Sequence, residues 1–242
     1  HGDGLQDIAL LRFYMVYRAM VRAKVWALRA QQAGPGSQFN AQARRYLALG
    51  AELAHAFKPA LILMHGLSGS GKSVFAGEIS ARLGGLWLRS DVERKRLHGL
   101  DALADSRAQV AGGIYDARTT ARTYARLAEA AEQALAAGWR VIVDAAFLRR
   151  DERAAMRELA RRHGLPCLVL ECQADPAVLR ERLRARQARR DDPSEADESV
   201  LARQQDHDEA LDADELRSAL VVETDGAIDS AALAQAVRAR CS

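Results

Sequence analysis

The chain has 242 residues, of which 49% are hydrophobic, 28% charged and 5% aromatic. This length allows a buried core without disulfides or metals, and it lies between one large domain and two small ones. Lys and Arg number 35 against 32 Asp and Glu, which leaves a net charge of +3. So small an excess argues against a non-specific nucleic-acid-binding protein.

The cysteine content and the termini indicate the compartment. Cys167, Cys172 and Cys241 form no CxxC pair, which favours a reducing environment. No apolar run approaches the roughly 18 residues of a membrane span, and the N-terminus has neither an initiator Met nor a signal-peptide pattern. We therefore expect a soluble, cytoplasmic protein without membrane contact and interpret the sequence as a fragment of a longer one.

The first part of the chain has a helical pattern. Apolar residues spaced by three and four predict an amphipathic helix over 5–32. Gly34-Pro35-Gly36 ends this helix, and Ser37 can cap a second helix over 37–57. Lys58-Pro59 ends the helical region, because proline disfavours helical geometry in the residue before it.

We divide the chain there into a helical segment, 1–58, and a second domain, 59–242. In the second domain, short apolar runs typical of buried parallel strands alternate with helical patterns. The predicted strands are 60–65, 86–88, 140–144, 167–171 and 219–223. The predicted helices are 72–83, 91–98, 113–137, 149–163, 176–190, 195–211 and 230–240. This alternation predicts an α/β fold with a five-stranded, doubly wound parallel sheet and right-handed crossovers.

A glycine-rich motif follows the first predicted strand. Gly66-Leu67-Ser68-Gly69-Ser70-Gly71-Lys72-Ser73 matches GxxxxGK[ST] and opens a predicted helix. Glycines let backbone N–H groups turn inward around an anion at a helix N-terminus. Lys72 would place its charge on the β- and γ-phosphates of ATP, and Ser73 would offer a hydroxyl ligand to Mg²⁺. The predicted nucleotide contacts are Gly66, Ser68, Gly69, Ser70, Gly71, Lys72, Ser73 and Val74.

Two acidic residues at strand ends are candidates for the remaining chemistry. Asp144 ends the third predicted strand, where a Walker B carboxylate would hold the metal or its water; alternatively, it caps the helix that begins near Arg149. Asp91 follows the second strand, and a carboxylate there can accept the proton of an attacking hydroxyl. Asp91 can also serve as a helix N-cap, and the two roles are compatible.

The sequence alone leaves two alternative roles for each of several arginines. Arg94 lies one helical turn after Asp91 and can contact the acceptor or lie in solvent. Arg182, Arg186 and Arg190 form one stripe on a predicted helix. Such arginines can neutralise charge on a transferred phosphoryl group, or they can form a solvated face paired with Glu181 and Asp191.

Residues 60–211 resemble the small P-loop kinases that are grouped with polynucleotide 5′-kinases and zeta-toxin-like ATPases. The matching residues are Gly66–Ser73, Arg89-Ser90-Asp91-x-x-Arg94, Val141–Asp144 and Asp175-Pro176. The resemblance implies a nucleoside-kinase-like P-loop fold, with Asp91 as general base and Arg94 as an acceptor contact. It also implies that Arg182 and Arg186 are lid arginines. Ala145-Ala146 departs from this family, which often has a polar residue directly after the Walker B Asp.

The N-terminal segment extends the resemblance. Together with the helix over 5–32, the chain is similar to the C-terminal half of bacterial proteins in which an aminoglycoside-phosphotransferase-like domain precedes such a kinase. Residues 1–58 would then be the tail end of that domain, which is missing here. His1-Gly2-Asp3 is similar to a phosphotransferase catalytic loop, but Ile8 stands where that loop needs a metal-binding Asn. We therefore expect no phosphotransferase site in this segment.

The sequence thus predicts a phosphotransferase that moves the γ-phosphate of ATP-Mg²⁺ to a hydroxyl of a small molecule or a nucleic-acid end. An adenylylsulfate kinase has a similar P-loop, but its Asp-Gly-Asp-Asn block is absent. A different class is an ATP-binding and ATP-hydrolysing module that regulates its N-terminal partner domain. Nucleic-acid binding without transfer lacks an aromatic stacking series, because we expect Trp87 and Trp139 in the core. The loop 99–112 has no pattern that identifies the acceptor.

Overall fold

The computed structural model describes residues 8–54, 58–106, 114–189 and 192–241. The chain forms two compact units, residues 1–57 and 58–242. Within the described part of the chain, no helix combines the length and the apolar character that crossing a bilayer requires.

The first unit is a pair of helices, α1 (Ile8–Ala33) and α2 (Phe39–Ala54). The Ser37 hydroxyl accepts a hydrogen bond from the backbone N–H of Phe39 at 3.2 Å, so the proposed cap is present. Trp26 of α1 packs on Phe39 of α2 with ring centroids 5.4 Å apart. Helix α2 is described as far as Ala54, and the remainder of the predicted helix, residues 55–57, lies outside the described part. Large apolar side chains on α1 are nevertheless exposed: Leu10, Leu11, Phe13, Tyr14, Met15, Tyr17, Met20, Val21, Val25 and Leu28.

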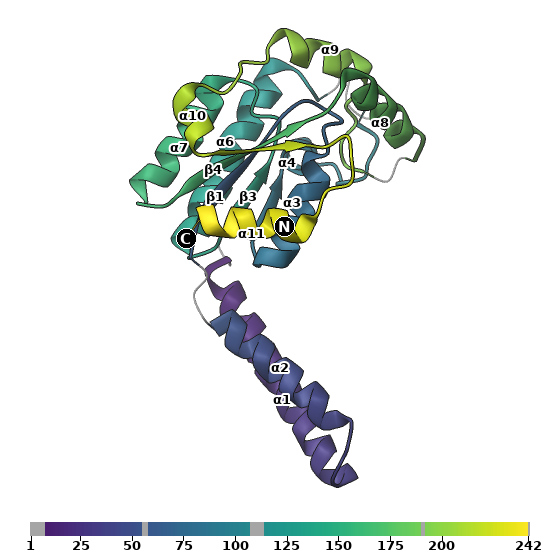
Figure 1. Ribbon diagram of the computed structural model, residues 1–242, viewed down its shortest axis with the longest axis vertical. Coiled ribbons are helices and arrows are strands. Elements are labelled where there is room, and N and C mark those ends of the chain that lie inside the picture. Colours follow the sequence, from purple (N-terminus) through teal and green to yellow (C-terminus); the bar gives the residue numbers. More distant parts are fainter. Residues whose placement is uncertain (1–7, 55–57, 107–113, 190–191, 242) are drawn as a thin grey trace. The chain divides into compact units, whose positions relative to one another are not determined.

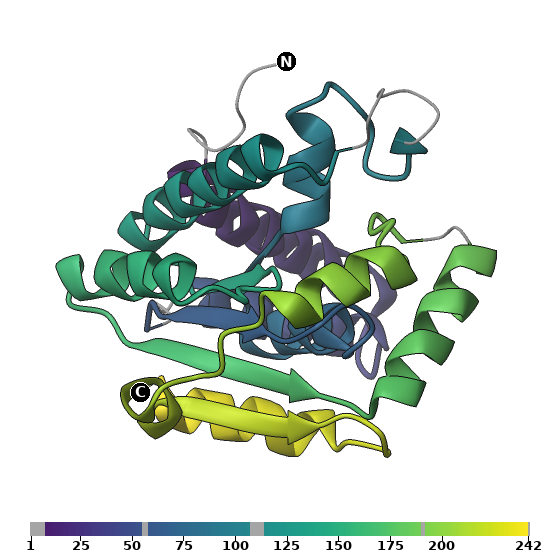
Figure 2. The same ribbon diagram turned by 90° about the horizontal axis from the view of Figure 1, so that it is seen from above.

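The second unit is a five-stranded parallel sheet with helices on both faces, as predicted (Figures 1 and 2). The strands are β1 (Leu61–His65), β2 (Leu86–Arg89), β3 (Val141–Asp144), β4 (Cys167–Gln173) and β5 (Ala219–Glu223), in the order β2-β3-β1-β4-β5. The helices are α3 (Lys72–Leu83), α4 (Ser90–Arg96), α6 (Ala117–Ala136), α7 (Arg150–Arg162), α8 (Pro176–Arg189), α9 (Glu198–Asp206), α10 (Ala213–Arg217) and α11 (Ser230–Arg240).

Both faces of the central strand are buried, which explains its unbroken apolar sequence. Side chains alternate between the faces of a strand. Ile62 and Met64 of β1 share a core with Ile79 of α3 and Val237 of α11. Helices α6 and α7 contact the sheet at β3 and β4, over the opposite face (Figure 2). A strand covered in this way can be apolar at every position.

One predicted helix is shorter in the structure. The sequence pattern indicates a helix over 195–211, whereas α9 covers Glu198–Asp206 and, after a break, a short helix that was not predicted, α10, begins at Ala213. The break has a local cause, because Asp212 forms a capping box with Glu215 and starts a new helix. Similarly, α6 begins at Ala117 because the Asp116 carboxylate accepts the Thr119 N–H, later than the predicted start at Gly113, which lies outside the described residues.

The strand register brings the candidate residues to one edge of the sheet. Arg89 at the end of β2 pairs with Asp144 at the end of β3. Strand β3 also pairs with β1, which leads directly into the glycine-rich loop. The carboxyl ends of parallel strands are where ligands bind in open α/β sheets. The glycine-rich loop, Asp144 and the start of α4 therefore border the same space.

Candidate active site

The glycine-rich loop has a backbone shape that requires glycine. Gly66 has a φ of +133°, and a Cβ there would lie 2.4 Å from the carbonyl oxygen of Cys172. Gly69 has a φ of +89°, and its Cβ would lie 2.8 Å from the carbonyl oxygen of Leu179. Both the dihedral angles and these close approaches exclude a side chain. The loop ends where α3 begins at Lys72, so it surrounds a helix N-terminus.

The Lys72 ammonium is held by the loop itself. Its Nζ donates hydrogen bonds to the carbonyl oxygens of Gly66 and Leu67, each at 2.7 Å. Burial lowers the pKa of Lys72, and the nearby carboxylates of Asp144 and Asp91 act in the opposite direction. The Lys72 cation is thus held at the first residue of α3, where an incoming polyphosphate would also meet the helix N-terminus.

Asp144 is a buried carboxylate at the end of β3. It is 5% exposed, its Oδ2 accepts a hydrogen bond from the indole Nε1 of Trp87 at 3.2 Å, and the Arg89 Nε lies 3.6 Å away. Burial raises the pKa of Asp144, although a hydrogen bond with Ser73 and the charges of Lys72 and Arg89 oppose this. Asp144 does not cap α7, because Arg149 is the N-cap there and the Arg150 N–H is bound by the Glu209 side chain.

Ser73 and Asp144 are suitable ligands for Mg²⁺. Both present oxygen atoms, which Mg²⁺ prefers, and both side chains line the same cavity. Among the described residues, no group of three or more His, Cys, Asp or Glu side chains is placed to hold a metal. A magnesium ion here would therefore take its other ligands from phosphates and water, as is usual for nucleotide-bound Mg²⁺.

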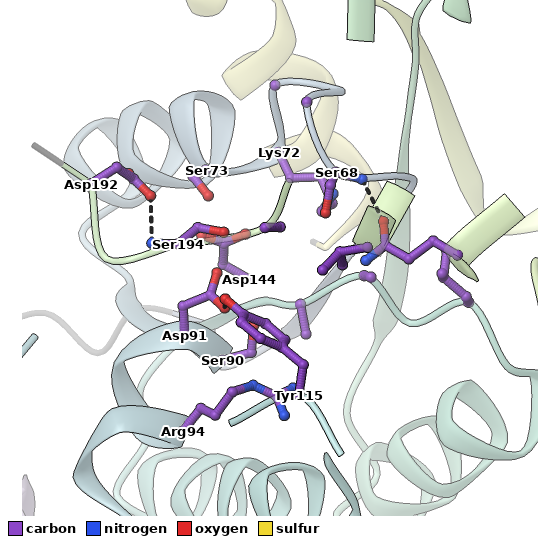
Figure 3. Close-up of a pocket in the computed structure, with 18 of the residues that line it drawn as sticks. Ser68, Lys72, Ser73, Ser90, Asp91, Arg94, Tyr115, Asp144, Asp192 and Ser194 are labelled. Carbon is purple, nitrogen blue, oxygen red and sulfur yellow. Dashed lines mark hydrogen bonds between the residues drawn. The ribbon is translucent and has the colours of Figure 1, made fainter. Parts of the chain in front are cut away.

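Asp91 lies in the first turn of α4 and faces the same space as Asp144 (Figure 3). The N-cap of α4 is Arg89, so Asp91 is not the cap. Its Oδ1 accepts a hydrogen bond from the Tyr115 hydroxyl at 3.2 Å. Burial, followed by the charge of Asp91, raises the pKa of Tyr115 far above its ordinary value. The tyrosine therefore remains a proton donor to Asp91 at any physiological pH.

Arg94 is buried, which rules out the solvated surface position. It is 6% exposed, and its Nη1 donates to the carbonyl oxygen of Ile114 at 3.1 Å and to Thr120 Oγ1 at 3.0 Å. Its guanidinium also lies over the Tyr115 ring, 4.9 Å from the centroid. Arg94 thus borders the cavity while it holds Tyr115 and the start of α6 in place.

The α8 arginines face the loop. Arg182 donates to the carbonyl oxygens of Gly69 at 3.3 Å and Thr224 at 2.5 Å. Arg186 donates to the carbonyl oxygen of Ala196 at 2.8 Å, and its charge lowers the pKa of Lys72. The two arginines thus have different surroundings, because Arg182 binds the P-loop and the turn after β5 and Arg186 binds the segment before α9. Arg190 and Asp191 lie outside the described residues.

These side chains line a single open cavity of about 870 Å³. The predicted site residues along its wall are Ser68, Gly69, Gly71, Lys72, Ser73, Val74, Asp91, Arg94, Asp144, Arg182 and Arg186. Gly66 and Ser70 are not among the residues that line the cavity. Both are buried within the glycine-rich loop.

Two residues of this wall, Tyr115 and Gln204, and one residue beside it, Trp87, were not found from the sequence. Tyr115 contacts Asp91, as described above, and the Gln204 side chain of α9 accepts the Ser68 N–H at 2.8 Å (Figure 3). Trp87, expected in the core, is 37% exposed and its indole reaches Asp144. Their partners are 24, 136 and 57 residues away along the chain. Neither spacing nor residue type indicates such contacts.

A parallel sheet in this strand order, with a P-loop after its central strand, is the fold of P-loop kinase-like domains. A family model described as an AAA domain (AAA_33) matches residues 61–211, more than half of the chain. The protein therefore belongs to the AAA_33 family.

Curated relatives are similar in part. The chain is 29% identical over 184 residues to the uncharacterized protein Rv2004c of Mycobacterium tuberculosis, a match that covers 76% of this chain and 36% of the relative. The uncharacterized protein Mb2027c of Mycobacterium bovis matches with the same values. The chain thus spans about a third of the length of these relatives.

Solved structures share the fold. A candidate kinase from Chloroflexus aurantiacus has a TM-score of 0.58 at 24% identity, over 76% of this chain and all of that one. A gluconokinase from Sinorhizobium meliloti has a TM-score of 0.50 at 21% identity, over 77% and 93% of the two chains. An adenylylsulfate (APS) kinase of Mycobacterium tuberculosis has the same TM-score and identity, over 76% and 97%. At these identities, the likeness shows the fold alone.

Proposed function

We propose that the protein is an ATP-dependent phosphotransferase with a hydroxyl acceptor. One observation carries this proposal: a single cavity is lined by the P-loop lysine and serine, by the buried Asp144 and by Asp91. A module that only binds a nucleotide needs Lys72, Ser73 and Asp144. The fourth residue, a second carboxylate in the same cavity, supplies the proton acceptor that transfer to a hydroxyl needs.

In the proposed reaction, Lys72 and the loop amides bind the β- and γ-phosphates. The oxygen of the acceptor hydroxyl forms a bond to the γ-phosphorus, and the bond from that phosphorus to the β–γ bridging oxygen breaks. ADP leaves with the bonding electrons, while the hydroxyl proton passes to Asp91 and then to solvent. Ser73 and Asp144 would hold Mg²⁺, and the bound ion would neutralise part of the charge on the phosphates.

The arginines would have separate roles in this reaction. We assign Arg186 to charge neutralisation at the transferred group, because it lines the same cavity as Lys72 and Ser73. Arg182 would border the nucleoside side, since it binds the turn after β5. Arg94 would affect the acceptor mainly indirectly, by holding the cavity wall around Ile114 and Thr120 in place. Its Nη1 already donates hydrogen bonds to both of these residues.

The nucleotide part of the proposal is tested by thermal unfolding. At a concentration 100 times its Kd, ATP-Mg²⁺ should add about 2.7 kcal/mol to the free energy of unfolding and raise the Tm by several degrees. Lys72→Ala should lose this increase, whereas Lys58→Ala, which changes an exposed lysine, should keep it. An equal increase in wild type and Lys72→Ala would refute nucleotide binding at the P-loop.

The acceptor part is tested by transfer of labelled γ-phosphate. Candidate acceptors are sugars, other polyols, nucleosides and oligonucleotides with a free 5′-hydroxyl. The proposal expects transfer to one class, with a large loss in Asp91→Asn. The alternative, an ATP-hydrolysing module that regulates a partner domain, expects phosphate release that no acceptor changes and that Asp91→Asn leaves intact.

We also propose that the α1–α2 unit is the tail end of a phosphotransferase-like domain. Exposed aromatic side chains on α1 support this, because Phe13 is 64% and Tyr17 59% exposed, and large exposed apolar surfaces mark interfaces. The greater length of the relatives agrees with it. A structure of the full-length protein tests the proposal: solvent around Phe13 and Tyr17 would contradict it.

A further inference from the structure

A buried lysine lies close to the acceptor side of the cavity. Lys95 of α4 is 1% exposed, and its Nζ lies 2.8 Å from Glu195 Oε1 and donates to the carbonyl oxygen of Ala102 at 3.1 Å. Lysine is almost never fully buried unless it is paired. The pair joins α4 to the segment between α8 and α9.

Glu195 is fixed by further contacts. The backbone N–H of Ser106 donates to Oε1 at 2.9 Å, and the Ser106 hydroxyl donates to Oε2 at 2.6 Å. Burial acts to raise the pKa of Glu195, but the hydrogen bonds from Lys95 and Ser106 outweigh it and leave the pKa below its ordinary value. The carboxylate is thus held at both oxygens, and the backbone that carries it is held as well.

The backbone N–H of Glu195 then acts on Tyr115. It donates to the Tyr115 hydroxyl oxygen at 3.1 Å, and the same hydroxyl lies 3.2 Å from Asp91 Oδ1. A backbone N–H can only donate, and an ionised carboxylate can only accept. The hydroxyl must therefore accept from Glu195 and direct its single proton to Asp91. The direction of both hydrogen bonds is determined.

We propose that Tyr115 is a positioning residue for Asp91, and that Lys95, Glu195 and Ser106 hold Tyr115 in the orientation that this requires. The proposal rests on the assignment of Asp91 as the base. Its effect is to hold Asp91 in one rotamer, with Oδ1 bound to Tyr115 and Oδ2 left for the acceptor hydroxyl. The Asp91 carboxylate, which takes up the proton, is thereby aligned before the hydroxyl substrate binds. Such alignment in advance increases the rate of the reaction.

The first experiment measures the Asp91 rotamer without any substrate. Three-bond couplings from ¹³Cγ to the backbone ¹⁵N and ¹³C′ report χ1 in the labelled full chain. We expect a single rotamer in wild type and averaged couplings in Tyr115→Phe. Glu195→Ala, which keeps the N–H but frees the backbone, should also give averaging.

A matched control is Tyr124→Phe. Tyr124 lines the same cavity, but its hydroxyl accepts the N–H of Phe147. This variant should leave the Asp91 couplings at the wild-type values. Wild-type couplings in Tyr115→Phe would overturn the proposal, whether or not the protein transfers phosphate. The result is thus separable from a failure of the proposed function.

Kinetics provide the second measurement, with ATP-Mg²⁺ and whichever acceptor the transfer assay identifies. Tyr115→Phe should lower kcat roughly 10-fold or more while the KM for ATP changes less than about twofold, because positioning acts in the transition state. In an Asp91→Asn background, Tyr115→Phe should have no further effect. A higher KM for ATP with unchanged kcat would show that Tyr115 supports nucleotide binding instead.

Discussion

The backbone N–H of Ser68, inside the P-loop, donates a 2.8 Å hydrogen bond to the side-chain oxygen of Gln204 on α9. This contact joins the phosphate-binding loop to the helix that follows the segment 192–197. The segment 192–197 also contacts residues beside the two candidate carboxylates. Asp192 pairs with Arg89, which lies beside Asp144. The backbone N–H of Glu195 binds Tyr115, which lies beside Asp91. The P-loop side and the Asp91 side of the cavity thus share one covering segment, residues 192–204.

We predict that Gln204→Ala frees the Ser68 amide. Loss of one hydrogen bond, worth about 1 kcal/mol, should speed hydrogen exchange at this amide roughly fivefold. Amide exchange followed by NMR measures it. Gln205→Ala, at the exposed neighbouring position, should leave the rate unchanged. Equal rates in wild type and Gln204→Ala would mean that the contact does not protect Ser68 in solution.

Asp144→Asn should stabilise the nucleotide-free protein and weaken its response to magnesium. Burial raises the pKa of Asp144, so the charged form costs folding free energy at neutral pH. Removing the charge should raise the free energy of unfolding by about 0.5–2 kcal/mol, the range common for single stabilising substitutions. The additional Tm increase that Mg²⁺ gives with ATP should disappear. Denaturant unfolding and thermal scans with and without Mg²⁺ measure both effects; a destabilised variant would contradict the first.

A buried ion pair behind the site should be important for stability. The Arg153 side chain is 0% and the Glu215 side chain 1% exposed, and Arg153 Nε lies 2.7 Å from Glu215 Oε1. Arg153 Nη1 also donates to the carbonyl oxygens of Phe147 and Leu148. Arg153→Met leaves a buried carboxylate without its partner, which should cost about 3–5 kcal/mol in denaturant unfolding. Arg217→Met, which breaks an exposed pair with Asp214, should cost far less. Similar losses in the two variants would refute this expectation.

Stability should decline on mild acidification because of His65. Burial, and then the charge of Arg153, lower the pKa of His65 in the folded protein. The unfolded chain then binds a proton that the folded protein does not, so the free energy of unfolding falls as pH drops through the ordinary histidine value of about 6.5. The decline stops below the folded pKa. Denaturant unfolding at a series of pH values measures it.

His65→Asn should flatten this part of the pH profile. His163→Asn, which changes a histidine paired with Glu132 at the surface, should leave the decline in place. A wild-type profile that is flat between pH 7 and 5 would show that His65 does not carry the effect.

The sequence by itself determined the strands, the order of elements and the phosphate-binding loop. These features depend on local chemistry: apolar runs such as 141–143 form strands wherever they can be covered, and Gly66 and Gly69 permit a backbone that no other residue adopts. The positions of Asp91 and Asp144 at strand ends could also be predicted, because parallel strands bring their carboxyl ends to one edge.

The surroundings of those residues were decided only by the tertiary structure. Whether Arg94 lies in solvent or beneath Tyr115, and whether Asp144 caps a helix or binds Trp87, depends on packing between distant segments. The helix expected over 195–211 shows the same limit, because the covering segment takes its shape from Lys95, Arg89 and the P-loop. Local spacing records which groups are available, but only the folded chain decides which of them meet, since each contact requires both partners to be held in place.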